Sequence, residues 1–286
     1  MNSSFSAADL RLPAGPVDLT AIDSGATPGF DGKKKAGTAA LMALGDDLSD
    51  LQERLYAEGV ADVGHGRAVL LVLQGMDTSG KGGTLKHTVG LVDPQGVRIS
   101  SFKKPTAEEL EHDFLWRIRK ALPTKGIIGV FDRSHYEEVL VVRVHELVPK
   151  DEIEGRYDVI NAFEAELAAV GITMVKCMLH ISADTQRERL LARLDDPTKH
   201  WKFNPNDIDE RGHWSAYREA YQIALERTNT EVAPWYVVPS DHKWYRNLAI
   251  AKLLHETLTR MKPQWPAADF DVEEQKRRLA DEAPVA

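Results

Sequence analysis

The chain has 286 residues, of which 43% are apolar and 28% charged, enough to bury the core of one large domain or two small ones. Its formal net charge of −8 argues against a surface built for nucleic acid, although a local basic groove for a polyanion stays open. The longest clean apolar run, Ala68 to Leu73, is too short to cross a membrane, and Met1 to Pro16 does not read as a secretory signal, so we expect a cytoplasmic protein without membrane or nucleic-acid partners.

The two ends of the chain differ in composition from its middle. Residues 1–35 are rich in Gly, Pro, Ala and Ser, show no sustained periodicity and end in the basic run Lys33 to Lys35. This composition predicts a flexible N-terminal arm. We expect a single domain over residues 36–262 and a C-terminal tail over residues 263–286.

Five leucines near the start of the domain predict the first long helix. Their spacings alternate between three and four residues, which places on one helix face Leu41, Leu44, Leu48, Leu51 and Leu55. The helix is expected to stop near Gly59. Such a face either covers the core or forms the seam of a dimer, because a short coiled contact needs the same register.

From Arg67 onward, short apolar runs alternate with helical patterns. Five runs predict buried strands: Val69 to Gln74, Val97 to Phe102, Ile127 to Phe131, Ile172 to Ile181 and Trp235 to Val238. Between them, Thr106 and Glu109 form a capping box at a helix start, and apolar residues from Ile153 to Val170 follow a helical period. Because strands alternate with helices, we predict an α/β fold with a parallel central sheet and helices on both faces.

A phosphate loop follows the first predicted strand. The segment Gly75-Met76-Asp77-Thr78-Ser79-Gly80-Lys81 has the spacing of Gly, four residues, Gly and Lys. The amides of such a loop curl round a phosphate, the following helix N-terminus adds positive potential, and Lys81 supplies a point charge. We expect phosphate contacts from the loop and the first helical turn, namely Gly75, Thr78, Ser79, Gly80, Gly82 and Gly83.

One position departs from the usual pattern of this loop. Gly82 stands where a Ser or Thr ordinarily ligates Mg²⁺. Asp77, inside the loop, is the candidate to replace that ligand, because a carboxylate among bound phosphates makes sense mainly beside a metal ion.

A second acidic motif follows the third predicted strand. Asp132 ends this strand on the same sheet edge as the phosphate loop, where a second metal carboxylate belongs. Ser134 is available to cap the next helix, which leaves Asp132 free, and Arg133 offers a forked donor for phosphate oxygens. Glu137 and Arg143 follow on that helix, where each is either a site residue or a solvated surface charge.

Residues 195–212 form a polar segment between two predicted helices. Its two prolines and many charges predict a mobile lid. Arg193, Lys199 and Lys202 suit closure over a highly charged substrate, since its charge must be neutralised when water leaves. Lys103, at the expected carboxyl end of another strand, is a further candidate for an anion contact.

Other chemistries find little support in the sequence. Cys177 is the single cysteine and lies in an apolar run, so it predicts a small core residue without disulfide or thiol chemistry. The histidines show no zinc-ligand spacing, and no serine stands in a nucleophile elbow. Zinc and acyl-transfer chemistry are therefore not expected.

Taken together, five motifs resemble those of the polyphosphate kinase 2 family. They are Gly75-Met76-Asp77-Thr78-Ser79-Gly80-Lys81-Gly82-Gly83, Phe102-Lys103-Lys104-Pro105-Thr106, Asp132-Arg133-Ser134-His135-Tyr136-Glu137, Asp196-Pro197-Thr198-Lys199-His200-Trp201-Lys202 and Ala233-Pro234-Trp235. The resemblance spans residues 41–258 and implies a three-layer α/β/α P-loop kinase fold with a helical lid, like that of thymidylate kinase. It implies an enzyme in which inorganic polyphosphate and a nucleotide exchange a phosphoryl group reversibly with Mg²⁺. It also accounts for Gly82, since this family carries its acid inside the loop.

The resemblance further implies roles for individual residues. Lys81 and the loop amides would hold phosphate, and Asp77 with Asp132 would position the metal and the acceptor phosphate. The cations that would neutralise the chain are Arg133, Arg193, Lys199 and Lys202. Glu137 is typical of the branch that phosphorylates both nucleoside monophosphates and diphosphates, such as AMP and ADP or GMP and GDP. Members restricted to diphosphates tend to carry Asn there. We also expect a homodimer or homotetramer.

Two other function classes stay open. An ATP-dependent nucleoside or nucleotide kinase of the thymidylate kinase type shares the fold and the loop, and turnover of ATP with a nucleoside and no polyphosphate would favour it. A binder of polyphosphate or nucleotide without catalysis would keep the loop and lose the acids, whereas this chain keeps Asp77 and Asp132.

Overall fold

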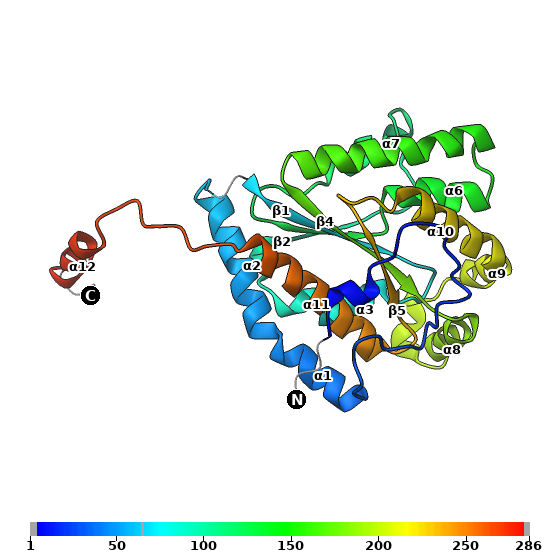
Figure 1. Ribbon diagram of the computed structural model, residues 1–286, viewed down its shortest axis with the longest axis horizontal. Coiled ribbons are helices and arrows are strands. Elements are labelled where there is room, and N and C mark those ends of the chain that lie inside the picture. The colour runs from blue at the N-terminus through cyan, green and yellow to red at the C-terminus, as the bar shows by residue number, and fades with distance from the viewer. Residues whose placement is uncertain (1–4, 64–65, 283–286) are drawn as a thin grey trace.

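A five-stranded parallel sheet forms the centre of the computed structural model, which describes residues 5–63 and 66–282 (Figure 1). The strands are β1 Ala68–Gln74, β2 Val97–Ser101, β3 Ile128–Asp132, β4 Ile172–His180 and β5 Trp235–Pro239, in the spatial order β2-β3-β1-β4-β5. All four neighbouring pairs are parallel. All five predicted strands are confirmed, with boundaries within one residue of those expected.

Helices cover both faces of this sheet, as the alternation predicted (Figure 1). One face carries α1 Lys34–Ala43, α2 Gly45–Val60, α3 Lys81–His87 and α11 Lys243–Met261. The other face carries α5 Trp116–Lys120, α6 Val141–Val144, α7 Lys150–Ala169 and α10 Trp214–Thr228. The remaining α-helices are α4 Ala107–Leu110, α8 Ala183–Leu194, α9 Asn206–Gly212 and α12 Val272–Ala280. Short 3₁₀ turns are η1 Ala7–Leu10, η3 Val89–Leu91, η4 Pro94–Gly96, η5 His135–Val139 and η6 Pro197–Lys202.

Strand β1 lies at the centre of the sheet and is buried on both faces. Leu70 and Val72 point into one core cluster, whereas Val69 and Leu71 point into the other, because successive strand side chains alternate between faces. Strand β2 is different, since it lies at the sheet edge and most of its residues are exposed or half-exposed. The expectation that every strand is buried on both faces is therefore wrong for β2.

The leucine-rich segment forms two helices rather than the one predicted. The break falls at Leu44, which is both the C-cap of α1 and the N-cap of α2. The end of α2 at Val60 agrees with the expected end near Gly59. Leu41, Leu48 and Leu55 are buried in the core beneath α11. This face is therefore covered by the chain's own core, as the simpler of the two interpretations required.

The N-terminal segment is packed against the domain, so the expectation of a flexible arm is wrong for its described part. Six of its apolar side chains are buried: Phe5, Leu10, Leu12, Val17, Leu19 and Phe30. The amide of Leu12 donates to the carbonyl of Trp235 in β5 at 2.8 Å. The apolar residues are spaced irregularly because the segment crosses the surface through a 3₁₀ turn and a series of turns and bends, so no helical or strand period revealed them. Residues 1–4 of the predicted arm lie outside the described residues.

The C-terminal tail leaves the domain after α11 ends at Met261. Residues 263–271 have almost no regular structure, and α12 then projects away from the rest of the molecule (Figure 1). Residues 283–286 of the predicted tail are outside the described part. Among residues 5–63 and 66–282, no helix has the length and apolar character needed to cross a membrane. The division at residues 36 and 262 remains a prediction.

Candidate active site

The phosphate loop connects the carboxyl end of β1 to the start of α3 at Lys81. Thr78 has a φ of 61°, a strained conformation for a β-branched residue and one that concentrates at functional sites. The hydroxyls of Thr78 and Ser79 are buried and find no hydrogen-bond partner among the described residues. Two orphaned hydroxyls in one loop fit a site whose remaining partner is a ligand.

Lys81 folds back across this loop. Its Nζ donates to the carbonyl of Gly75 at 2.6 Å. Burial and the nearby Arg133 guanidinium lower the pKa of Lys81, while Asp77 and Asp132 oppose that shift. The ammonium group is therefore held at the loop by groups that a phosphate oxygen would supplement.

Strand β3 brings the second motif beside the loop. Asp132 pairs with Leu73 in the sheet register, so both strands end at the same edge. Arg133 has a φ of 65°, which turns its side chain back over the loop, and its Nη2 lies 3.3 Å from Asp77 Oδ1. Its Nη1 lies 3.9 Å from Glu137 Oε2. The structure therefore brings together four of the five predicted catalytic side chains at the mouth of the loop, and Lys81 lies just behind them.

Glu137 is a pocket residue and not a solvated surface charge. Its side chain is 16% exposed, and burial raises its pKa although Arg133 and Lys81 act in the opposite direction. When the amide of Gln74 is oriented to satisfy both its ends, Nε2 donates to Glu137 at 3.1 Å and Oε1 accepts from Ser134. Ser134 also accepts from the amide of Tyr136, as the predicted cap requires.

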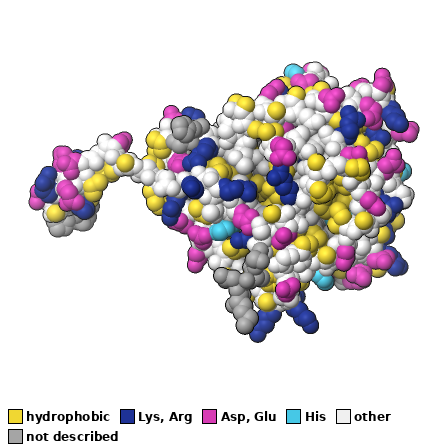
Figure 2. Space-filling view, in the orientation of Figure 1, with side chains coloured by type: hydrophobic (Ala, Val, Ile, Leu, Met, Phe, Trp, Pro, Cys, Tyr) yellow, Lys and Arg dark blue, Asp and Glu magenta, His cyan; other side chains and the backbone are white. Residues whose placement is uncertain are grey.

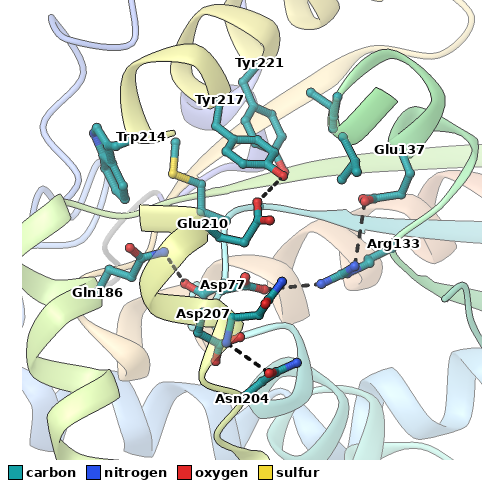
Figure 3. Close-up of a pocket in the computed structure, with 15 residues that line it drawn as sticks. Asp77, Arg133, Glu137, Gln186, Asn204, Asp207, Glu210, Trp214, Tyr217 and Tyr221 are labelled. Atoms are coloured by element: carbon teal, nitrogen blue, oxygen red, sulfur yellow. Dashed lines mark hydrogen bonds and ion pairs between the residues drawn. The ribbon is translucent and has the colours of Figure 1, made fainter. Parts of the chain in front are cut away.

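The opposite wall of the pocket comes from α9 and α10 (Figure 3). Asp207 and Glu210 point inward from α9, and Tyr217 and Tyr221 from α10. Tyr217 donates to Glu210 at 2.7 Å. Burial, followed by the charge of Asp77, raises the pKa of Asp207. The α9 segment belongs to the predicted lid, which therefore lies over the phosphate loop, while its mobility remains a prediction.

Sequence reasoning missed most of this second wall. Its members are Gln186, Asn204, Asn206, Asp207, Glu210, Trp214, Tyr217 and Tyr221. Their only sequence signal was acidic and aromatic residues one helical turn apart, such as Glu210, Trp214 and Tyr217, a pattern that amphipathic surface helices share. Gln186 makes a contact with the phosphate loop that the sequence did not predict, since its Nε2 donates to the carbonyl of Asp77 at 3.0 Å.

The other predicted phosphate-binding cations are placed less centrally. Arg143 is turned away from this pocket and pairs with Glu154 at 2.8 Å, so the structure does not bring it to the site. Arg193 reaches the pocket rim, where it lies 3.4 Å from Asp207. Lys199 pairs with Asp196 within the lid at 2.6 Å.

Lys202 and Lys103 are both exposed to solvent and line no part of this pocket. The Nζ of Lys202 lies 4.8 Å from the ring centroid of Trp201. Figure 2 shows positive and negative side chains intermingled over the face in view, in agreement with the net charge of −8. The positive charge near the pocket therefore comes from Arg133, which lines it, from Lys81 at the loop and from Arg193 at the rim.

The donor set fits Mg²⁺. In the described part of the chain, no group of three or more His, Cys, Asp or Glu side chains is arranged to hold a metal by itself. Mg²⁺ in phosphotransfer sites takes only one or two carboxylates, with waters and substrate phosphates completing its shell. Asp77 and Asp132 satisfy that requirement, and the mutual repulsion of Asp77 and Asp207 is what a bound cation would relieve.

Several motif residues beside the site have a structural role that the sequence did not reveal. Lys176, in the middle of β4, is fully buried and pairs with Glu164 at 2.6 Å. Its Nζ also donates to Tyr136 Oη at 2.9 Å, and Glu164 lies 3.2 Å from His135 Nε2. Trp235 completes this buried network by donating to the hydroxyl of Thr228. The network anchors His135 and Tyr136, two of the three residues between Arg133 and Glu137.

A parallel sheet in this order, a phosphate loop after β1 and an acid at the end of β3 together define a phosphotransferase of the P-loop kinase class. A profile of the polyphosphate kinase 2 family matches residues 31–266. The chain belongs to the polyphosphate kinase 2 family.

Individual relatives agree with this assignment. An AMP/ADP-polyphosphate phosphotransferase of Meiothermus ruber is 47% identical over 254 residues, which cover 89% of this chain and 93% of that protein. An ADP-polyphosphate phosphotransferase of Rhodopseudomonas palustris is 46% identical over 77% of this chain and 78% of its own. The crystal structure of polyphosphate kinase 2 from Arthrobacter aurescens TC1 matches with a TM-score of 0.94 and 48% identity, covering 99% of both chains.

Proposed function

We propose that this enzyme transfers the terminal phosphoryl group of inorganic polyphosphate reversibly to AMP and ADP, with Mg²⁺ as cofactor. The observation that carries the proposal is the convergence of Asp77, Arg133 and Glu137 on one pocket at the carboxyl edge of the sheet, with Lys81 held against the loop beside them. The relative from Meiothermus ruber, whose name includes both acceptors, supports the choice of nucleotides. A cytoplasmic location and a homodimer or homotetramer remain further predictions.

Each group has a distinct task in this proposal. Lys81 and the loop amides hold phosphate. Arg133, which lies beside Asp77, neutralises charge on the phosphate oxygens of the substrate. Asp77 and Asp132 are the residues that would hold Mg²⁺, which when bound screens the charge of the phosphates. Among the described residues, no histidine lines the pocket. Alignment and electrostatics therefore carry a direct transfer without a phosphoenzyme.

The deciding experiment measures ATP formed from AMP or ADP with polyphosphate and Mg²⁺ as the only other reactants. We expect ATP from both acceptors. Turnover of ATP with a nucleoside, and none with polyphosphate, would replace the proposal by the thymidylate kinase alternative. A phosphorylated protein formed by polyphosphate alone and competent toward ADP would contradict direct transfer.

Glu137→Asn is expected to depress the use of AMP more than the use of ADP. A monophosphate leaves a gap where a longer acceptor would place its terminal phosphate, and the Glu137 carboxylate is positioned to fill that gap through a metal or water bridge. With ADP the same carboxylate meets more negative charge, so its benefit shrinks. We expect kcat/KM for AMP to fall by about 10- to 100-fold more than for ADP, the effect of one charged contact.

Glu138→Asn is the matched control, because Glu138 is as buried as Glu137 but faces Arg156 at 2.6 Å. That variant should lose stability without changing the ratio of the two acceptors. Steady-state kinetics at fixed polyphosphate and Mg²⁺ decide the matter, and equal losses for AMP and ADP in Glu137→Asn would remove Glu137 from the acceptor site.

Polyphosphate binding should weaken as salt rises, despite the net negative charge. Each cation that contacts the chain releases condensed counterions, and three contacts from Lys81, Arg133 and Arg193 predict about a 20- to 40-fold loss of affinity between about 50 and 200 mM salt. Titration with polyphosphate of defined length measures this slope, and AMP binding serves as the shallower control. An affinity that stays flat over this range is incompatible with a cationic site.

A further inference from the structure

Arg246 lies directly behind the phosphate loop, on the first turn of α11. It is 2% exposed. Its Nη1 donates to the carbonyl of Ser79 at 3.2 Å, and its Nε and Nη2 donate to the side-chain oxygen of Asn247 at 3.2 and 2.9 Å. All of these acceptors are neutral oxygens.

A buried guanidinium ordinarily has a carboxylate partner, because an uncompensated charge in the interior is costly. Within residues 5–63 and 66–282, Arg246 forms no ion pair within 4.0 Å. Burial and the neighbouring Arg189 lower the pKa of Arg246 to about 10, which still leaves it protonated at neutral pH. The charge therefore persists without a counter-ion in this part of the chain.

The surroundings of Arg246 add positive charge. Arg189 donates to the carbonyls of Thr78 and Ser79 at 2.8 and 3.2 Å, so it braces the same loop. Lys243 lies on the same turn of α11 as Arg246, and burial followed by the charges of Arg189 and Arg246 lowers its pKa. The carboxylate of Asp241 is engaged by Ser182 and Ser24. The charges of Asp241 and Glu188 act on Arg189, whereas no described carboxylate lies within 4.0 Å of Arg246.

Two glycines show how closely the loop rests on this guanidinium. A Cβ on Gly80, which has a φ of 116°, would lie 1.6 Å from Arg246 Nη1. A Cβ on Gly83 would lie 2.5 Å from Nη2, whereas one on Gly82 would meet nothing within 4 Å. Gly83 is thus required by Arg246, while Gly82 faces open space. The positive charge sits immediately beneath the first turn of α3.

We infer that Arg246 is a positioning residue for phosphate binding. By holding the carbonyl of Ser79 at the back of the loop, it leaves the loop amides facing the pocket. A phosphate chain bound at the front supplies the negative charge that Arg246 lacks, so part of the cost of burying Arg246 is recovered only on binding. The inference rests on the proposed phosphate site and adds a residue that does not touch the ligand.

The test measures the thermal midpoint of unfolding with and without long-chain polyphosphate, and the KM for polyphosphate, in Arg246→Gln and Arg246→Lys. In Arg246→Gln the free protein should keep or raise its midpoint, because an uncompensated charge is removed, while the rise induced by polyphosphate shrinks. We expect KM to increase by at least about tenfold, within the range usual for coupling between sites, with a smaller change in kcat. Arg246→Lys, which retains the charge, should restore most of the induced rise.

A purely structural role predicts the opposite pattern. A lower midpoint of the free Arg246→Gln protein together with an unchanged polyphosphate-induced rise overturns the inference, as does an Arg246→Lys variant that loses the induced rise completely. Arg260→Gln replaces an exposed arginine on the same helix and controls for the loss of one charge.

Lys81→Ala, studied in the same way, distinguishes a failure of the proposed phosphate site from a failure of the role inferred for Arg246. If Lys81→Ala keeps the full induced rise, the proposed phosphate site itself is wrong. If only Arg246→Gln keeps it, the inference about Arg246 alone is wrong.

Discussion

Lys81→Ala is expected to lower kcat for ATP formation by about 10²- to 10³-fold, the usual effect of removing one donor that faces developing charge. Lys81 is the first residue of α3 after the loop, and its Nζ is held at 2.6 Å from the carbonyl of Gly75. The fold should survive, because Lys81 is half-buried at the loop and belongs to neither core cluster. Turnover with saturating polyphosphate and ADP, together with the midpoint of thermal unfolding, tests both statements.

Lys86→Ala is the matched control for this variant. Lys86 lies on the same helix, five positions further on, and is exposed to solvent. The Lys86→Ala substitution removes the same charge from a residue that does not reach the loop, so activity should stay near the wild-type value. Equal activity losses in the two variants would mean that the general potential of α3, rather than the contact of Lys81, supports the reaction.

Lys176→Met is expected to lower the free energy of unfolding by about 3–5 kcal/mol, the usual cost of removing one partner of a buried ion pair. Burial disfavours the charged form of Glu164, yet Lys176 and His135 hold its pKa below the ordinary value. Without Lys176, the carboxylate keeps two partners in the described part of the chain, His135 and the Tyr136 hydroxyl. Urea unfolding measures the loss, and activity should fall with it because Tyr136 lies between Arg133 and Glu137.

Lys125→Met provides the comparison for this second variant. Lys125 pairs with Asp62, but both side chains are more than half exposed, so the loss of stability should be far smaller. Replacing both partners, in Lys176→Met with Glu164→Gln, should recover part of the stability because no unpaired carboxylate remains. A Lys176→Met protein as stable as the wild type would show that the buried pair contributes little.

Several structural features were predictable because their signals are local in the chain. Each of the five strands was predicted from a short apolar run between turn residues. The capping box of Thr106 and Glu109 formed as predicted, although the helix it starts ends at Leu110. Val170, placed on the buried face of α7 by the period, is 65% exposed because the helix ends one residue earlier. The periodic pattern therefore located the helix correctly but did not predict the exposure of the residue at its end.

The contacts of charged residues were predicted less well, because no periodic pattern in the sequence shows which residue a charged side chain will pair with. Glu137 and Arg143 stood equal in the sequence, yet the fold turns Glu137 into the pocket and pairs Arg143 with Glu154. Lys176 lies inside the apolar strand β4, and the carboxylate that allows its burial, that of Glu164, comes from α7. Such pairings depend on which helix crosses which strand.

The sequence by itself determined the α/β class, the position of the phosphate loop, and the acids inside that loop and at the end of β3, because each depends on neighbouring residues. Only the tertiary structure decided the second wall of the pocket and the support behind the loop. Arg246 reaches Ser79 across 167 positions, and Gln186 reaches Asp77 across 109. Contacts at that separation form only when packing of the two cores brings α11 and α8 to the sheet edge, so no local pattern of residues encodes them.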